Sequence, residues 1–139
     1  MIKDTIYKDL LSELKDKPNR LKHVIGVRDT ALEFGEKYKL DLEELEIAAL
    51  LHDITKYYTT KQNKEIIDSY FEETERIYEY YNEKILHAFS AYVLAKEKYN
   101  IKSGEILNSI LNHTIGRPNM SMYEKVIFIS DYTEPNRTY

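Results

Sequence analysis

The sequence predicts an all-α domain, a helical bundle of about seven helices. Apolar residues recur at three- and four-residue spacing along almost the whole chain, which is the period of an amphipathic helix. Glycine and proline are scarce, with 4 and 3 occurrences, and they fall mainly where helices would begin or end. Strand-like alternation of polar and apolar residues is weak. The 139 residues fit one domain, which we place at 1–139.

The first two expected helices are defined by their apolar faces and by the proline between them. Residues 2–15 carry isoleucine and leucine along one face, and Pro18 is expected to end this helix. Residues 20–38 repeat the pattern with leucine, valine, alanine and phenylalanine directed inward.

The next two helices begin at capping residues. Asp41 opens the run DLEE, a capping-box pattern in which the Asp and Glu side chains each satisfy a free backbone amide. The helix that follows, LEELEIAALLHDI, becomes very apolar before His52. Thr59 and Thr60 are candidate caps of a short helix that runs through Ser69.

Three further helices complete the bundle. Residues 82–99 form one, Ser103 is a suitable cap for the next, and the run SMYE from Ser121 is a second capping box. The run VIFIS at 126–130 is rich in β-formers, but it follows this capping box, so we predict that it is helical.

Composition excludes several classes of protein. There is no cysteine, so a metal ion would be held by nitrogen and oxygen ligands. The formal net charge of −4 disfavours nucleic-acid binding, which depends on neutralising phosphates, but it allows a small phosphorylated ligand. No apolar run is long enough to span a bilayer, and the charged N-terminus lacks the apolar stretch of a signal peptide. We therefore expect no membrane partner and a cytoplasmic protein.

The sharpest motif is LLHDITK at 50–56. An apolar helix here delivers adjacent side chains that can both bind metal, the imidazole of His52 and the carboxylate of Asp53. Lys56, one turn later, offers a cation suited to a phosphate. An HD dipeptide alone is weak evidence, because many arise by chance and a histidine at a helix end is usually a cap. For Lys56, the alternative is an ordinary solvated lysine.

The other histidines strengthen the motif. All four histidines fall on apolar or helix-embedded segments, where an unpaired polar side chain is costly. Any one of them could be a satisfied core histidine, but four of them with two carboxylates indicate a shared interior site. The candidate ligands are His23, His52, Asp53, His87, His113 and Asp131.

Five segments carry a resemblance to a known family. They are RLKH at 20–23, AALLHDITK at 48–56, HAFSA at 87–91, NHTIGRPNM at 112–120 and ISDYTEPNR at 129–137. The order H…HD…H…H…D resembles the HD-domain metal-dependent phosphohydrolase superfamily. The more specific HTxGRxxM and DYxEPxR patterns are similar to those of its YqeK-type branch, the symmetrical dinucleoside tetraphosphate hydrolases. Members usually continue with helical sequence after EPxR, so we expect this chain to lack a C-terminal helical extension.

The resemblance implies a two-metal centre. Its first ion would be held by His23, His52, Asp53 and Asp131, and its second by His87 and His113, with Asp53 bridging. Two divalent or mixed-valent transition metal ions are implied, iron above all, although imidazole and carboxylate ligands also suit Mn, Zn or Co.

The implied reaction is attack of a metal-bridged hydroxide on phosphorus, which would cleave diadenosine tetraphosphate into two ADP. Asp53 and Lys56 would be the catalytic residues. Contacts to the nucleotide substrate are expected from Arg20, Lys56, Thr114, Gly116, Arg117, Glu134 and Arg137. Several of these have simpler alternatives: Arg117 and Arg137 as solvated cations, Gly116 as a helix C-cap and Glu134 as a cap.

Two other functions stay open on the sequence. The same ligands would serve a phosphatase acting on another nucleotide, such as a nucleoside monophosphate or a signalling nucleotide. The chain could also be a non-catalytic nucleotide-binding or scaffold module, although no ligand of the pattern is missing. Whether the protein forms a homodimer is also open.

Overall fold

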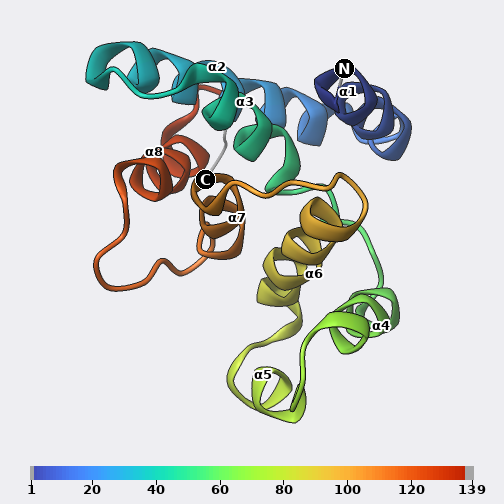
Figure 1. The fold of residues 1–139 in the computed structure, drawn as a ribbon. Helices are drawn as coiled ribbons and strands as arrows, with labels where there is room; N and C mark the ends of the chain where they lie inside the picture. Colours follow the sequence, from blue (N-terminus) through green and yellow to red (C-terminus); the bar gives the residue numbers. More distant parts are fainter. Residues whose placement is uncertain (1, 137–139) are drawn as a thin grey trace.

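The computed structural model describes residues 2–136, and all regular structure in them is helical (Figure 1). This confirms the predicted all-α class. The eight helices of these residues are α1 Ile2–Glu13, α2 Pro18–Tyr38, α3 Leu42–Leu51, α4 Thr60–Tyr70, α5 Glu75–Tyr80, α6 Glu83–Glu97, α7 Gly104–Leu111 and α8 Met122–Thr133. The additional helix is α5, which has only six residues and none that is buried, so its apolar pattern is too short to predict a helix.

Four of the eight helices in residues 2–136 begin at a residue whose side chain caps them. The side chains of Thr59 and Ser121 accept from the amides three residues on, and both form complete capping boxes. Asp41 caps α3 alone, because the Glu44 side chain accepts a hydrogen bond from Ser103 Oγ at 2.8 Å instead of turning back. The reciprocal half of that predicted capping box is therefore wrong, and Glu44 ties the start of α3 to the start of α7.

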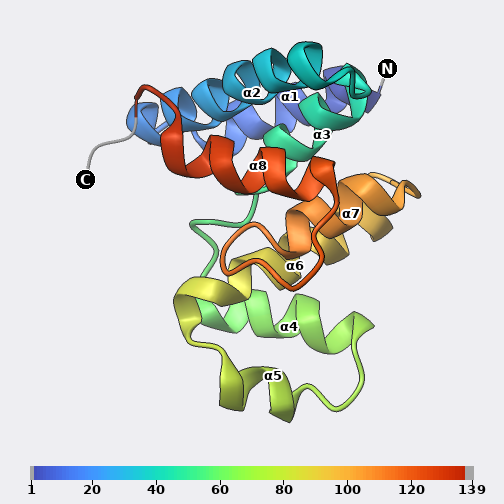
Figure 2. The ribbon, with the colours of Figure 1, turned by 90° about the vertical axis from the view of Figure 1, so that its left-hand side faces the viewer.

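Helix α3 lies in the centre of the bundle. Its C-terminal half is apolar on all sides, and all of its residues from Ile47 to Leu51 are buried. It packs against α2, α7, α1 and α8, while α2 also contacts α8 and α4 packs on α6 (Figure 1). Figure 2 shows α8 running beside α2, with α4 and α5 at the opposite end of the molecule. The C-terminal end of α3 therefore points into the protein interior.

Two helices end before the histidines that they were expected to contain. Helix α3 ends at Leu51, so His52 is its C-cap and Asp53 lies in the following turn. Helix α7 ends at Leu111, and His113 likewise lies in the turn after it. Side chains in such turns are freed from the fixed angular spacing of a helix, so they can converge on one point.

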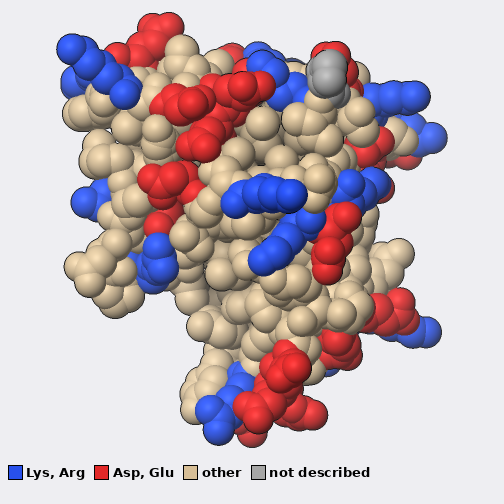
Figure 3. Space-filling model, viewed as in Figure 1, with Lys and Arg blue, Asp and Glu red and all other residues tan. Residues whose placement is uncertain are grey.

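The structure shows neither a helix that could span a membrane in the described residues nor a separation of charges on the face that is drawn. No helix within residues 2–136 combines the length and the apolar character that a bilayer-spanning segment needs. On the face drawn in Figure 3, the described residues present acidic and basic side chains intermixed.

Candidate metal centre

The six predicted ligands come together at the centre of the bundle from five separate segments. The ligand atoms form two groups, and within each group they all lie within 4.8 Å of one another. Five of the six residues are buried and Asp131 is partly exposed. The first group is His23 of α2, His52 and Asp53 after α3, and Asp131 of α8, and the second is Asp53 with His87 of α6 and His113 after α7.

Asp53 divides its two oxygens between the groups. Its Oδ1 lies 3.2 Å from His87 Nε2 and 3.6 Å from His113 Nε2. Its Oδ2 lies 3.2 Å from His52 Nε2 and 3.7 Å from His23 Nε2. A carboxylate in this position can bind one ion through each oxygen.

Asp131 serves the first group alone. Its Oδ1 lies 2.8 Å from His23 Nε2 and 3.6 Å from His52 Nε2. The first group thus contains two carboxylates, whereas the second contains the shared Asp53 and no other carboxylate of the described residues.

Backbone carbonyls fix three of the imidazole rings. In each case Nδ1 lies 2.5–2.7 Å from the carbonyl oxygen three residues earlier. A carbonyl oxygen only accepts, so Nδ1 carries the hydrogen and the neutral ring presents the lone pair of Nε2 to the cluster. The pairs are His52 with Ala49, His87 with Lys84 and His113 with Ile110.

The fourth ring is oriented by a carboxylate. His23 Nδ1 donates to Glu134 Oε2 at 2.7 Å, and the Glu134 side chain is fully buried. The other oxygen of Glu134 accepts from the backbone N–H of Asn136 at 2.6 Å. Gly26 makes room for this carboxylate, since a Cβ there would lie 2.1 Å from Glu134 Oε1. A carboxylate behind a histidine strengthens it as a metal ligand.

The Nε2 atoms of the histidines face the interior of the cluster, and their surroundings show whether the site suits a cation. His87 Nε2 and His113 Nε2 lie 3.2 Å apart, so two lone pairs face each other unless a proton or a metal ion lies between them. The buried His52 Nε2 has no well-oriented hydrogen-bond partner in the described residues. Both observations fit transition metal ions held by imidazole and carboxylate.

The same charges perturb the acidities of the ligands. Burial disfavours the charged form of His52, but Asp53 and Asp131 outweigh burial and raise the pKa of His52 to about 10. Burial would raise the pKa of the Asp53 carboxyl, yet His52, His113 and His87 hold it well below its usual range. In His113, burial dominates and lowers the pKa. The centre therefore requires positive charge, supplied by protons or by metal ions.

A cleft of about 370 Å³ opens onto the cluster. Its walls include Asp53 and His113 together with three cations, Arg20, Lys56 and Lys84. The guanidinium of Arg20 also bonds Asp53 Oδ2 at 3.0 Å. Burial lowers the pKa of Arg20, but the negative charge of Asp53, with a contribution from Asp131, outweighs burial and raises it. The cleft therefore offers both a candidate metal centre and positive charge for phosphates.

The remaining predicted substrate residues lie in different places. Thr114 lines this cleft, while Gly116 and Arg117 line an adjoining cavity. Gly116 has a φ of +72°, but the C-cap of α7 is Asn112, so the alternative role of Gly116 as a helix C-cap is wrong. Arg117 directs its fork at Glu124, with Nε 2.9 Å from Oε2. Glu134 is hydrogen-bonded to His23 and does not line the cleft. Arg137 is not among the residues that the structure describes.

Two positions were missed by the sequence reasoning. Lys84 lines the cleft and stands one helical turn before His87, so the argument used for Lys56 could also have found it. Thr55 donates to the carbonyl of His87 at 2.8 Å and lies 2.7 Å from Ser90 Oγ, which joins the turn after α3 to α6. A buried threonine beside an HD pair gives no such signal in the sequence.

A family model and curated relatives match this chain. A model of the HD domain matches residues 20–136. Two relatives named "Bis(5'-nucleosyl)-tetraphosphatase, symmetrical" are similar over 121 residues, one from Halalkalibacterium halodurans at 35% identity and one from Bacillus subtilis at 36%. Each alignment covers 87% of this chain and 64% of the relative, so the chain spans less than two thirds of their length.

A solved structure is also similar. It is a crystal structure from Clostridium acetobutylicum, described as a predicted HD superfamily hydrolase involved in NAD metabolism. The two chains share 38% sequence identity with a TM-score of 0.84, and the match covers 98% of this chain and 70% of the other.

Proposed function

This chain belongs to the HD domain family, and from that premise we propose that it is a metal-dependent hydrolase that cleaves dinucleoside tetraphosphates symmetrically. Diadenosine tetraphosphate would give two molecules of ADP. The relatives named symmetrical bis(5'-nucleosyl)-tetraphosphatases support this substrate class. The homodimer left open by the sequence and the cytoplasmic location belong to the proposal as well.

The observation that carries the proposal is the arrangement around Asp53. Its two oxygens face two different groups of histidines, and the Nε2 atoms of all four histidines lie within 3.7 Å of one of these oxygens. We assign the first ion to His23, His52, Asp53 and Asp131, and the second to Asp53, His87 and His113. The donor set suits iron, which is the metal that we propose, as well as manganese, zinc or cobalt.

Two such ions, when bound, supply an activated water nucleophile and neutralise charge on the phosphoryl oxygens. The residues of the chain provide binding and orientation. Lys56 and Lys84 lie on the cleft wall, where their ammonium groups would bind non-bridging phosphate oxygens. Arg20 bonds Asp53 and also lines the cleft, so its guanidinium can hold the carboxylate in place and bind a phosphate with the donors that remain.

The test is turnover of diadenosine tetraphosphate by protein reconstituted with Fe²⁺ or Mn²⁺, with the products separated by nucleotide chromatography. We expect ADP as the sole product. Asp53→Ala should abolish turnover, because the variant loses the oxygens assigned to both ions. Asp16→Ala, which removes an exposed carboxylate after α1, is the matched control and should retain full activity.

Three results would correct the proposal at different levels. Formation of AMP and ATP instead of ADP would show that cleavage is not symmetrical. Phosphate release from nucleoside monophosphates without turnover of the tetraphosphate would leave the metal-dependent chemistry and overturn the substrate. Absence of turnover by protein whose metal content is confirmed would overturn the enzymatic function.

A further inference from the structure

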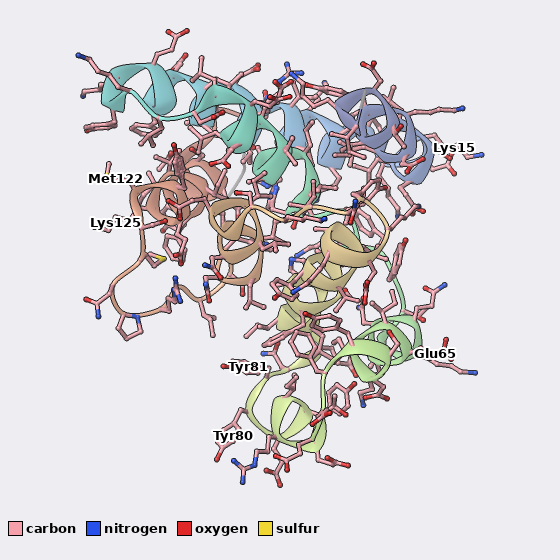
Figure 4. The ribbon with its side chains drawn as sticks, viewed as in Figure 1. Lys15, Glu65, Tyr80, Tyr81, Met122 and Lys125 are labelled. Carbon is pink, nitrogen blue, oxygen red and sulfur yellow. The ribbon has the colours of Figure 1, made fainter. Side chains whose placement is uncertain are left out.

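A buried carboxylate lies on α8 apart from the six candidate ligands. Glu124 is the third residue of this helix, and it is only 1% exposed. Its neighbours in the helix, Met122 and Lys125, are exposed on the outer side of α8, away from α7 (Figure 4). Burial raises the pKa of Glu124, but hydrogen bonds, above all those from Arg117, outweigh burial and lower it. The side chain is therefore an ionised group in the protein interior.

Four donor groups of the described residues bind this carboxylate. Oε2 accepts from Arg117 Nε at 2.9 Å and from Asn112 Nδ2 at 3.2 Å, and Oε1 accepts from a second nitrogen of Arg117 at 2.5 Å. Oε1 also accepts from the amide of Ser121 at 3.4 Å, which completes the capping box of α8. Asn112 directly precedes His113, and Arg117 follows it by four residues. Glu124 therefore holds the chain on both sides of His113.

The start of α8 does not require the bonds to Asn112 and Arg117. The complete capping box at the start of α4 uses Gln62, which is neutral and exposed. Its side chain accepts from the amide of Thr59 at 2.8 Å, which is all that the cap needs. A charged group in the interior costs free energy unless its hydrogen bonds are well made. The bonds of Glu124 to the loop after α7 therefore indicate a role beyond starting the helix.

Glu124 and a candidate metal ligand share one face of α8. Asp131 follows Glu124 by seven residues, which is about two helical turns. Asp131 belongs to the first group of ligands, and His113 belongs to the second. Glu124 thus joins the helix that carries one group to the turn that carries part of the other. His23, His52, Asp53 and Asp131, which form the first group, all come from segments outside the loop after α7.

We propose that Glu124 is a positioning residue of the second metal site. It fixes the turn after α7 against α8, and in this way it keeps His113 Nε2 close to Asp53 Oδ1, at 3.6 Å, where one ion can bind both atoms. Arg117 is its partner in this arrangement. The inference rests on the proposed function, because it assumes that both groups hold an ion. Loss of the Glu124 charge should weaken binding of the second ion and spare the first.

The experiment removes the charge of Glu124 and keeps its capping atom. Glu124→Gln can still accept from the amide of Ser121, but it no longer forms an ion pair with Arg117. Mn²⁺ is titrated into metal-free protein by calorimetry, and His113→Ala identifies the binding event of the second site. In Glu124→Gln we expect the affinity for the second ion to fall about tenfold or more, the scale found for residues that orient metal ligands. The affinity for the first ion should stay unchanged.

A matched control separates positioning from helix stability. Ser121→Ala removes the hydroxyl that accepts from the amide of Glu124 at 3.2 Å and keeps the carboxylate that binds Asn112 and Arg117. It should lower the urea concentration at which the protein unfolds and leave both Mn²⁺ affinities unchanged. Electron paramagnetic resonance gives a second readout. Two Mn²⁺ ions that share the Asp53 carboxylate are magnetically coupled, whereas Glu124→Gln at the same Mn²⁺ concentration should show isolated ions.

Several results would overturn the positioning role. They are unchanged affinities in Glu124→Gln, equal loss of both ions in this variant, or an equal effect of Ser121→Ala on the second ion. If Glu124→Gln fails to fold by circular dichroism, Arg117→Met decides: weaker binding of the second ion alone supports the role, and any other pattern refutes it.

Failure of the proposed function gives a different result. A wild type that binds a single Mn²⁺ ion would overturn the two-ion centre and this inference together, before any variant is compared. Because the titrations need no substrate, absence of diadenosine tetraphosphate turnover by protein with two bound ions would refute the proposed function and leave the positioning role of Glu124 standing.

Discussion

Replacing Gly26 by alanine should disturb the metal centre from outside it. The new Cβ would lie 2.1 Å from Glu134 Oε1 and 2.9 Å from Glu134 Cδ, so the carboxylate would have to move by about 1 Å to reach an ordinary contact distance. Glu134 is held on one side by His23 Nδ1 at 2.7 Å and on the other by the amide of Asn136 at 2.6 Å. A buried side chain that is fixed at both oxygens cannot move this far without breaking one of these bonds.

The size of the effect follows from three contributions. Loss of a hydrogen bond to a charged group costs about 1.5–3 kcal/mol, and overpacking adds about 1–3 kcal/mol. The better helix propensity of alanine in α2 offsets up to about 1 kcal/mol. We expect Gly26→Ala to lower the free energy of unfolding by about 2 kcal/mol or more. Because His23 loses its orienting partner, metal affinity should fall by about 10–100-fold.

The assay is equilibrium unfolding in urea together with Mn²⁺ titration of the same preparation. Gly104→Ala is the matched control, because a Cβ at Gly104 has nothing within 4 Å. It should leave metal affinity unchanged and the free energy of unfolding unchanged or slightly higher. The reasoning is refuted if the two alanine variants bind Mn²⁺ equally well and unfold at the same urea concentration.

Three further predictions follow from the site. Asp53→Asn should reduce bound metal at both positions, since its two oxygens face both groups; a variant that keeps two ions by metal analysis contradicts the bridge. In metal-free protein, the stability contributed by charged His52 is complete below its unfolded pKa of about 6.5 and is lost as pH rises towards its folded pKa of about 10. Metal affinity rises over the same interval, because the proton on His52 must leave before a metal ion binds. Unfolding curves and Mn²⁺ titrations at several pH values should show these opposite slopes, and flat profiles would exclude them. Ser90→Ala removes a buried hydroxyl 2.7 Å from Thr55 Oγ1 and 2.8 Å from Asn63 Oδ1 and should cost about 1–3 kcal/mol in urea unfolding, whereas a change near zero would show that this contact is not stabilising.

Helical periodicity and capping residues were sufficient to predict most of the fold. Thr59 and Ser121 begin helices as predicted, and VIFIS at 126–130 lies within α8 in spite of its β-rich composition. The capping signal is local, so the sequence carries it directly. Helix α5 could not be predicted in this way, because it has no buried face. The bond from Ser103 to Glu44 joins residues 59 apart, which no local pattern records.

The candidate ligands were predictable as a set, but their supporting partners were not. Histidines and aspartates in apolar segments are conspicuous, and the structure brings all six together. Glu134 was expected to contact substrate or to cap a helix; it is the C-cap residue of α8, and its side chain in addition accepts from His23 across 111 residues. Thr55 bonds the carbonyl of His87 at 2.8 Å, a contact that only the packing of the turn after α3 on α6 creates. Such roles depend on which segments meet, and that is decided by packing of the whole bundle.

The way in which the imidazole rings are held has an evolutionary consequence. His52, His87 and His113 are oriented by main-chain oxygens, and every amino acid supplies such an oxygen. A change of the side chain three residues earlier therefore leaves the oxygen that orients each ring in place. His23 relies instead on the Glu134 side chain, which fits because Gly26 has no Cβ. These three positions should show strong epistasis in deep mutational scanning, so that changes tolerated at one depend on the residues at the other two.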